Sequence, residues 1–462
     1  MDGIVAALGQ FFRSPAFKFF MIGGLIIVLL IPLFLVAVLI GERTQRAESV
    51  RQEVAREWGG SQAIKGPLLI VPYTVRRVIQ QGDKTIEEVI ERRAVFLPQR
   101  LNINGKAATK VLHRSIYDVA VYSSVLDFEG SFAAPDISEV ATDVQSVRWR
   151  DAVMTLAIND VSGLKTAAAL TVDGSRRLDF EPSLGVPGAR SNGIHVRLGG
   201  VPELEETSTG TAPGGGPLKG FAFKFQLNLN GSQQLTFAPA AQETTVNLSS
   251  DWSDPSFTGA FLPTERVIEG GGFSARWQVP HLARSIPQAW SLADQDIERL
   301  TSYVFGVHFF VPVDFYQLVS RAAKYAMMFV ATAFMAVFLL ELRASRQVHP
   351  VQYFFVGLTI IFFYVLLLSL AEQIGFLAAY LVASVATGGL LSLYVAKVQR
   401  SLVKGLAMGG IFVALYGLLY MILQLEDYAL LAGAIAGFLM LAVVMFSTIN
   451  VDWSGKMRTA SS

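Results

Sequence analysis

The chain of 462 residues contains no cysteine. This absence excludes disulfide bonds, cysteine nucleophiles and zinc sites built on thiolates. The sequence also lacks the G-x-S-x-G, H-E-x-x-H and Walker A patterns, and no G-x-G-x-x-G opens a helix. The five histidines stand singly, without a second histidine three or four residues away. We therefore expect a protein that is not an enzyme and that holds no cofactor and no metal.

An excess of charge of one sign is missing as well. Lysine and arginine number 38 and aspartate and glutamate 37, and no basic stripe stands out. Because a nucleic-acid partner needs clustered positive charge, we expect none. Charged residues make up only 16% of the chain, whereas apolar residues make up 52%. This balance is unusual for a soluble protein and indicates that a large part of the chain lies in a membrane.

Six long apolar segments are present. The first, Phe19 to Gly41, carries no charge, and roughly 20 apolar residues suffice to cross a bilayer. It is too long for the apolar core of a cleaved signal peptide, so we interpret it as an uncleaved anchor. The other five lie in the last third of the chain, at about Tyr325–Leu342, Tyr353–Ala371, Phe376–Ala396, Leu406–Leu425 and Ala429–Thr448. The sequence predicts a bundle of six transmembrane helices.

The charges that flank these segments predict their orientation. One set of flanks carries Arg13, Lys18, Arg343, Arg346, Lys397, Arg400, Lys404, Lys456 and Arg458. The short loops on the other side carry no lysine or arginine, and short cytoplasmic loops are normally rich in both. Both termini are therefore expected in the cytoplasm, with the chain crossing the membrane several times and the large domain outside, where the absence of cysteine suits a bacterial periplasm. The predicted order is 1–18 cytoplasmic N-terminus, 19–41 anchor, 42–320 periplasmic domain, 321–450 five-helix bundle and 451–462 cytoplasmic tail.

The region 42–320 has the texture of an all-β domain. Phe221 to Leu229 alternates large apolar with mainly polar residues, as a strand with one buried face does. The dipeptides Asn104-Gly105, Asp173-Gly174, Asn192-Gly193 and Asn230-Gly231 are typical of turns. These signals predict an antiparallel, β-sandwich-like domain. The stretch 205–220, rich in glycine, serine and threonine, is either a loop within one domain or a linker between two lobes.

Two groups of residues are candidates for contacts. Ionisable residues of the apolar segments fall at predicted span ends, and none lies near a midplane, which argues against ion-coupled transport. We expect the outer-side loops to dock the external domain or a partner, with plain solvated turns as the alternative; their residues are Glu372, Gln373, Glu426 and Asp427. Glycines spaced by four residues favour helix contacts, within one chain or between two, at Gly405, Gly409, Gly433 and Gly437.

Several strings carry a family resemblance over nearly the whole chain. They include Trp58-Gly59-Gly60-Ser61-Gln62, Val71-Pro72-Tyr73, Ser250-Asp251-Trp252, Arg321-Ala322-Ala323-Lys324-Tyr325, His349-Pro350-Val351-Gln352-Tyr353 and Glu372-Gln373-Ile374-Gly375-Phe376. In these strings the sequence resembles the CreD family of bacterial inner-membrane proteins, often labelled cell-envelope integrity proteins. The resemblance implies a role in envelope integrity and stress tolerance, linked to a two-component signalling system, and supplies no reaction.

Two functional hypotheses follow. In the first, the periplasmic β-domain binds or scaffolds an envelope component, with the bilayer and an envelope lipid or protein as partners. In the second, the protein carries or transports a lipid or another hydrophobic molecule, and the β-domain provides an apolar groove. An intramembrane enzyme would need polar side chains that converge at one depth, and the predicted spans contain few.

Overall fold

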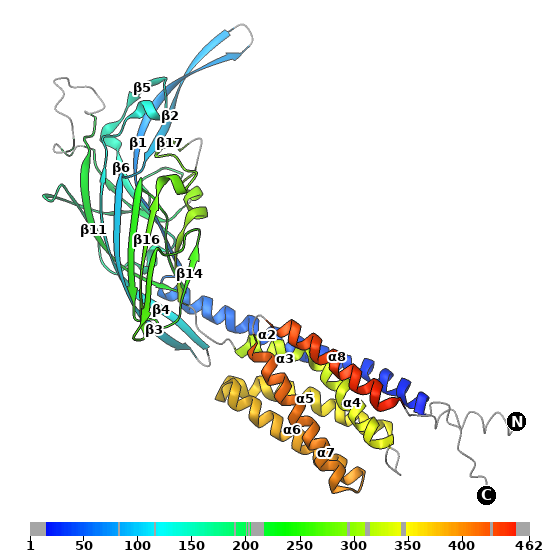
Figure 1. The fold of residues 1–462 in the computed structure, drawn as a ribbon. Coiled ribbons are helices and arrows are strands. Elements are labelled where there is room, and N and C mark those ends of the chain that lie inside the picture. The colour runs from blue at the N-terminus through cyan, green and yellow to red at the C-terminus, as the bar shows by residue number, and fades with distance from the viewer. Residues whose placement is uncertain are drawn as a thin grey trace, which may run out of the picture. The chain divides into compact units, whose positions relative to one another are not determined.

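A computed structural model describes residues 15–81, 84–114, 117–188, 191–199, 201, 204, 217–292, 296–309, 315–342, 348–425 and 428–449. The chain divides into two compact units, which we call the helical unit, Met1–Glu48 with Val313–Ser462, and the sheet unit, Ser49–Pro312. Figure 1 shows the helices of the first unit and the strands of the second. Each unit is described by itself.

Six helices cover the apolar segments of the sequence: α2 Pro15–Trp58, α4 Ala326–Leu342, α5 Pro350–Ile374, α6 Phe376–Val398, α7 Leu402–Gln424 and α8 Ala429–Thr448. A short helix that the apolar segments do not predict, α3 Phe315–Lys324, precedes α4. Among the described residues, five helices are long and apolar enough to cross a membrane, namely α2, α5, α6, α7 and α8. Helices α3 and α4 meet at 48° and make a sixth span if the bent pair is counted as one. The predicted combination of membrane helices with a large β region is confirmed at this level.

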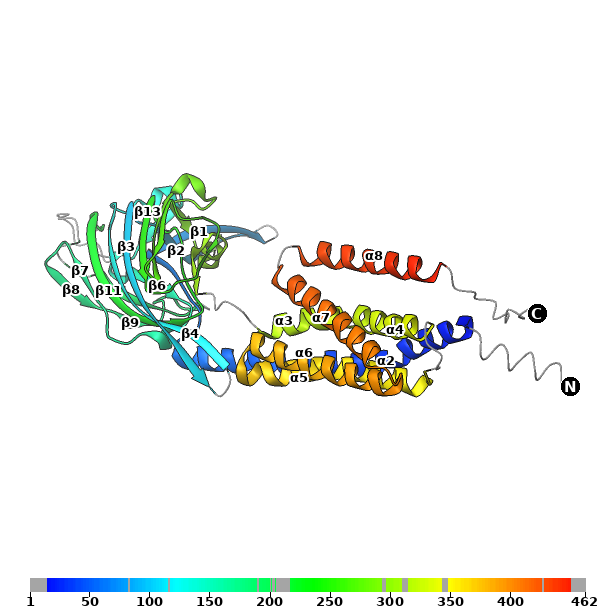
Figure 2. The same ribbon diagram turned by 60° about the horizontal axis from the view of Figure 1, so that its bottom comes forward.

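Local signals explain where the central helices begin and end. His349 caps the N-terminus of α5 in a capping box with Gln352, and Pro350 occupies the first turn. Helix α5 ends at Gly375, whose φ of 77° suits glycine. Helix α6 follows at once and lies between α5 and α7, as Figure 2 shows. These three helices make the most extensive contacts between helices of the helical unit.

Two sheets make up the sheet unit. The described residues of the first form ten strands: β1 Gln62–Gln81, β2 Lys84–Phe96, β5 Val144–Val147, β6 Val153–Ile158, β9 Glu181–Pro182, β10 Gly193–Arg197, β12 Gln234–Phe237, β14 Pro255–Gly259, β17 Ala289–Ser291 and β18 Phe305–Phe309. The second has eight, in the order β15 Glu265–Glu269, β16 Gly272–Pro280, β13 Glu243–Ser250, β3 Arg100–Arg114, β4 Tyr117–Phe132, β11 Phe221–Ser232, β7 Ala169–Val172 and β8 Arg176–Asp179. Short 3-10 helices connect some strands, among them η2 Trp149–Asp151, η3 Val161–Gly163 and η6 Ile297–Tyr303.

One hydrophobic core joins the two sheets. Strand β11 contributes every second residue from Phe221 to Leu229, as its alternation predicts, and the residues between them are exposed or half-buried. The rings of Phe128 and Phe225 stack with their centroids 4.6 Å apart. The largest side chains that are completely buried in this unit are Trp277, Tyr73, Tyr122, Phe128, Phe237 and Phe305. The space between the sheets is thus filled by side chains.

The sheets differ from the predicted antiparallel arrangement because two pairings are parallel. Strand β1 runs parallel to β12, and β3 runs parallel to β13, so both sheets are mixed. Strands from before and after the stretch 205–220 pair with each other, since β4 pairs with β11. The whole β region therefore belongs to one compact unit.

Two of the predicted turns are wrong. Asn104-Gly105 lies inside β3 and Asn230-Gly231 inside β11. A Cβ on Gly105 would lie 2.8 Å from Leu248 Cδ1, and one on Gly231 would lie 2.3 Å from the Tyr122 hydroxyl. These glycines therefore make room for neighbouring side chains within a strand. The sequence alone does not distinguish such a glycine from one that forms a turn. Asp173-Gly174 does form the turn between β7 and β8, with positive φ at both residues.

Candidate functional site

The outer face of the eight-stranded sheet carries polar side chains in straight rows. Since side chains alternate along a strand, the residues between the core positions all point outward. Strand register aligns them across six strands, and one row consists of Glu265, Arg276, Asn247, Asn104, Asp127 and Gln226. A second row consists of Val267, Ser274, Ser249, Lys106, Val125 and Asn228.

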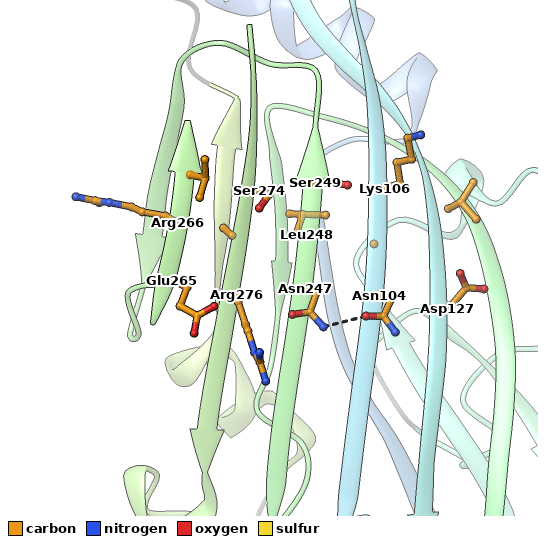
Figure 3. A pocket seen from close by; sticks show the side chains of 14 residues that line it. Asn104, Lys106, Asp127, Asn247, Leu248, Ser249, Glu265, Arg266, Ser274 and Arg276 are labelled. Carbon is orange, nitrogen blue, oxygen red and sulfur yellow. Dashed lines mark hydrogen bonds between the residues drawn. The ribbon is translucent and has the colours of Figure 1, made fainter. Parts of the chain in front are cut away.

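Hydrogen bonds between strands hold several of these side chains in place. The Asn247 amide donates to the Asn104 side-chain oxygen at 2.9 Å, and Figure 3 shows the two side chains meeting between β13 and β3. The Gln226 amide donates to the Asp127 carboxylate at 2.8 Å. Lys224 pairs with Glu129 in the neighbouring row, and this pairing raises the pKa of Lys224. The face is therefore partly ordered before any ligand arrives, which lowers the entropy cost of binding.

These rows line an open groove of about 710 Å³, which we call the polar groove (Figure 3). Its charged residues are Lys106, Arg266 and Arg276 against Asp127 and Glu265. None of the described residues that line it is aromatic. Its chemistry is hydrogen bonding and charge pairing over an extended surface, without a platform for ring stacking. Among the described residues, no group of three histidine, aspartate or glutamate side chains gathers as metal ligands.

Asp251 anchors the end of β3 close to this face. Its carboxylate accepts from the Thr109 backbone N–H at 2.8 Å and from the Thr109 hydroxyl at 2.7 Å. Burial disfavours the charged form, but the hydrogen bonds from Thr109 outweigh burial and lower the pKa of Asp251. The string Ser250-Asp251-Trp252 therefore has a structural role at this corner of the sheet.

A closely packed segment, which we call the junction, connects the end of α2 to the sheets. Gly59 has φ of 112°, and a Cβ there would lie 2.7 Å from the Gly163 Cα. The Gln62 side chain donates to the backbone oxygens of Gly59 and, at 2.9 Å, of Asp160. The Trp58 indole N–H donates to the Tyr122 backbone oxygen at 3.2 Å. The string from Trp58 to Gln62 therefore serves to close this junction.

An arginine forms ion pairs at the side of this junction. Arg114 at the end of β3 reaches two carboxylates on the last turns of α2, Glu53 at 3.0 Å and Glu57 at 3.3 Å. All three side chains are well exposed, so each pair contributes little by itself. The pairs connect the last turns of α2 with the end of β3.

A buried carboxylate that sequence reasoning missed lies in the helical unit. Glu341 near the end of α4 pairs with Lys18 of α2, and its side chain is 6% exposed. The Val348 N–H donates to it at 2.7 Å and the Tyr353 hydroxyl at 2.8 Å. In the sequence, Glu341 is one more charge at a span end, and no local signal shows that three partners surround it.

Hydroxyl groups also gather between α5, α6 and α7. The Tyr380 hydroxyl donates to the Tyr416 backbone oxygen at 2.6 Å, and the Tyr416 and Thr387 hydroxyl oxygens lie 2.8 Å apart. Tyr364 is completely buried, and its hydroxyl has no hydrogen-bond partner among the described residues. The three helices thus bring together polar groups that look scattered in the sequence, and the bonds of Tyr380 and Thr387 with Tyr416 tie α6 to α7.

The residues predicted to dock the external domain have different positions. Glu372 is half-buried and accepts from the Tyr316 hydroxyl at 3.1 Å within the helical unit, while Gln373 is exposed. Glu426 and Asp427 lie outside the described residues. Arg321 of α3 donates to the Leu425 backbone oxygen at 3.0 Å, at the end of α7. Docking through these loops stays a prediction.

The four predicted glycines all lie on helices that pack against a neighbour. A Cβ on Gly405 would lie 2.5 Å from the Ala396 Cβ, and one on Gly409 would lie 3.0 Å from the Ser392 hydroxyl, so both face α6. A Cβ on Gly433 would lie 2.6 Å from the Tyr325 ring, and Gly437 faces Met328 at 3.8 Å. Each glycine of α7 and α8 named here therefore faces another part of the same chain.

Comparison with known proteins gives one consistent result. A family model described as "Inner membrane protein CreD" matches residues 14–454. The chain is 30% identical over 442 residues to the inner membrane protein CreD of Escherichia coli strain K12, and the match covers 96% of this chain and 94% of that protein. The match includes both the helical unit and the sheet unit.

Proposed function

Because the chain belongs to the CreD family of inner membrane proteins, we propose that it is a non-enzymatic protein that supports the integrity and stress tolerance of the cell envelope. In this proposal the sheet unit lies in the periplasm and both termini lie in the cytoplasm. The distribution of lysine and arginine around the apolar segments supports this orientation. The sheet unit then faces the envelope polymers.

The polar groove carries the functional part of the proposal. It offers amide, carboxylate and guanidinium groups in registered rows, and part of them are already fixed by hydrogen bonds such as that between Asn247 and Asn104. An extended polymer with many hydroxyl and amide groups, such as a peptidoglycan strand, can form hydrogen bonds along such rows. The sheet unit therefore acts as a binding or scaffolding surface for a polar envelope polymer.

The test uses the full chain in nanodiscs and purified peptidoglycan as the probe. Asn247→Ala combined with Arg276→Gln removes donors from the centre of the polar groove, and we expect at least about tenfold weaker binding in co-sedimentation. Arg177→Gln on β8 is the matched control, since it removes an exposed arginine from the far edge of the same sheet. Equal binding of all three proteins would contradict the role of the groove.

A second test addresses orientation. Since the chain has no cysteine, single cysteines introduced by Lys106→Cys and Ser401→Cys report their side of the membrane without background. A membrane-impermeant maleimide should label the first in cells with a permeabilised outer membrane, and should label the second only after lysis. The reverse pattern would overturn the periplasmic placement.

A lipid-carrying function is the second candidate, and one observation favours it. A cleft of about 720 Å³ opens at the side of the sheet unit with Leu164, Phe180 and Ile194 among its lining residues. The ammonium of Lys165 at its rim lies 5.3 Å from the Trp58 ring. Ala168→Trp should fill this cleft, so a lipid bound there would disappear from native mass spectra of the variant. Retention of the same lipid would argue against the cleft as its site.

A further inference from the structure

A separate cavity of about 480 Å³ lies on the side of the first sheet and is rich in arginine. Its basic residues come from several elements: Arg93 from β2, Arg148 and Arg150 on either side of Trp149 at η2, and Arg197 from β10. We call it the arginine cavity. Its volume falls in the range of small-molecule sites. It shares no lining residue with the polar groove.

Positive charge exceeds negative charge in this cavity. Two carboxylates, Glu91 and Asp151, stand among the four arginines of the lining. A third, Glu181, lies just behind, 3.7 Å from the Arg197 guanidinium and 3.6 Å from the His195 ring. Among the described residues, Arg150 makes no ion pair. Against Glu91, Asp151 and Glu181, the four arginines of the cavity leave an excess of one guanidinium group.

The carboxylates hold two of the arginines in fixed positions. Glu91 accepts from Arg148 at 2.7 Å and from Arg93 at 3.3 Å. Arg148 also reaches Asp151 through its Nε at 3.2 Å. A guanidinium group has five donors, so these bonds leave other N–H groups of residues that line the cavity for a ligand. Guanidinium groups held in place in this way are the usual means by which proteins recognise phosphate groups.

Another part of the lining is tightly packed around His195. His195 is 5% exposed, and its Nδ1 lies 3.0 Å from the Ser183 backbone oxygen. A Cβ on Gly185 would lie 2.6 Å from the His195 ring, so glycine lets the loop from Ser183 lie flat on the imidazole. Ser183 itself has φ of 82°, a conformation that a serine rarely adopts. The loop is thus held in a defined shape beside the arginines.

We propose that the arginine cavity binds a small molecule or headgroup that carries a phosphate. A carboxylate occupies one guanidinium fork, whereas a phosphate offers three oxygens and can accept from Arg148, Arg150 and Arg197 together. A phosphate monoester carries about −1.5 to −2 charges at neutral pH, which suits the excess of positive charge. The volume leaves room for an organic group beyond the phosphate. This site is independent of the polymer-binding role of the polar groove.

The position of Trp149 allows a direct test. Trp149 stands between Arg148 and Arg150 in the sequence, and it is half-buried. We would titrate the full chain in an uncharged detergent with glycerol 3-phosphate at constant ionic strength and record tryptophan emission. We expect a saturable change that Trp149→Phe removes, while the ligand still raises the melting temperature of that variant. A linear, unsaturated response in both measurements would overturn the proposal.

The variants separate a site from general charge attraction. Arg150→Gln combined with Arg197→Gln removes two exposed guanidinium groups, and we expect at least about tenfold weaker binding. Arg299→Gln on η6, an exposed arginine outside the cavity, is the matched control and should bind as the parent does. The melting temperature without ligand should be the same for all three. Equal affinity of the double variant and the parent would overturn the proposal.

Further arms distinguish the source of the phosphate. The protein is placed in nanodiscs of phosphatidylglycerol and, separately, of phosphatidylcholine, and the titration with glycerol 3-phosphate is repeated. Phosphatidylglycerol is a phosphodiester, so a third set of nanodiscs contains phosphatidic acid, whose headgroup is a phosphate monoester like glycerol 3-phosphate. If phosphatidic acid weakens the titration of the parent more than the other two lipids do, and the double variant loses this competition, the cavity takes a lipid headgroup. If all the membranes give the same saturable titration, the cavity takes a soluble phosphate ester.

Discussion

Replacing Glu298 by glutamine should destabilise the sheet unit at neutral pH and have no effect at low pH. Lys65 on β1 is a buried lysine, with 5% of its side chain exposed. Its ammonium lies 2.8 Å from the Glu298 carboxylate and 3.1 Å from the Thr301 hydroxyl. Ser191 also donates to Glu298. The hydrogen bond from Lys65, followed by that from Ser191, lowers the pKa of Glu298 to about 2.

The magnitude follows from that pKa and from exposure. A fall from 4.5 to about 2 corresponds to roughly 3 kcal/mol if it is fully expressed as stability. However, 48% of the Glu298 side chain is exposed, and solvent screens the interaction, so about 1 kcal/mol is a better figure. The variant also leaves the buried Lys65 ammonium without a counter-charge, which adds to the loss. We expect Glu298→Gln to lower the free energy of unfolding by about 1–2 kcal/mol at pH 7.

The pH dependence has a definite sign. The folded-state pKa of Glu298 is depressed, so its contribution is complete above the unfolded pKa near 4.5 and is lost as the pH falls towards 2. The parent should lose this part of its stability in that window, and the variant should not. The two proteins should therefore differ at pH 7 and converge near pH 2.

Urea denaturation of the full chain in an uncharged detergent provides the assay. Five of the six tryptophans lie in the sheet unit, at Trp58, Trp149, Trp252, Trp277 and Trp290, so emission reports chiefly on that unit. Glu269→Gln on the exposed edge strand β15 is the control and should change the midpoint little. A difference between Glu298→Gln and the parent that is absent at pH 7, or that persists undiminished near pH 2, would refute the reasoning.

Two further predictions concern the junction and the buried carboxylate. Gly59→Ala should destabilise the sheet unit by about 3 kcal/mol or more, because its Cβ would lie 2.7 Å from the Gly163 backbone. Gly270→Ala, which has positive φ and open space, should cost only about 1 kcal/mol in the same urea assay; similar losses would show that the close approach is unimportant. In the helical unit, Glu341→Gln should cost about 3 kcal/mol because Lys18 loses its counter-charge, and Tyr353→Phe only about 1 kcal/mol. Thermal unfolding followed by size-exclusion chromatography measures the stability of both variants of the helical unit. Equal melting temperatures of the parent and Glu341→Gln would rule out a structural role for the ion pair of Glu341 with Lys18.

The helices were predictable because membrane insertion depends on a local property. The segment Phe376–Ala396 was expected from apolar length alone, and α6 runs from Phe376 to Val398. The short helix α3 was not expected as a separate element, since its apolar residues cover only one face. Its buried residues, Tyr316, Val319 and Ala322, recur every three residues. The predicted end of the external region at residue 320 falls inside this helix, whereas the boundary between the units falls at Pro312.

The strands were predictable where one face is buried. Alternation marks β11, but β1 is buried on both faces from Ala63 to Tyr73, and its aliphatic run Leu68–Val71 shows no alternation. Which strands pair is not a local property. Strands β3 and β13 pair in parallel although about 140 residues separate them, as Asn104 opposite Asn247 shows. The rows of the polar groove depend on such pairings, so the sequence alone could not reveal them.

The strings that carry the family resemblance serve mainly to hold the fold. Gly59 permits the junction of α2 with the sheets, His349 and Gln352 cap α5, and Tyr353 binds the buried Glu341. The polar groove and the arginine cavity are lined chiefly by residues outside these strings, such as Asn247, Arg276 and Arg150. Membership of the family therefore predicts the architecture and says little about the ligand. Two chains of this family can share every one of these fold-holding contacts and still present different side chains in the groove and in the cavity, so the ligand has to be sought at those two surfaces in each chain.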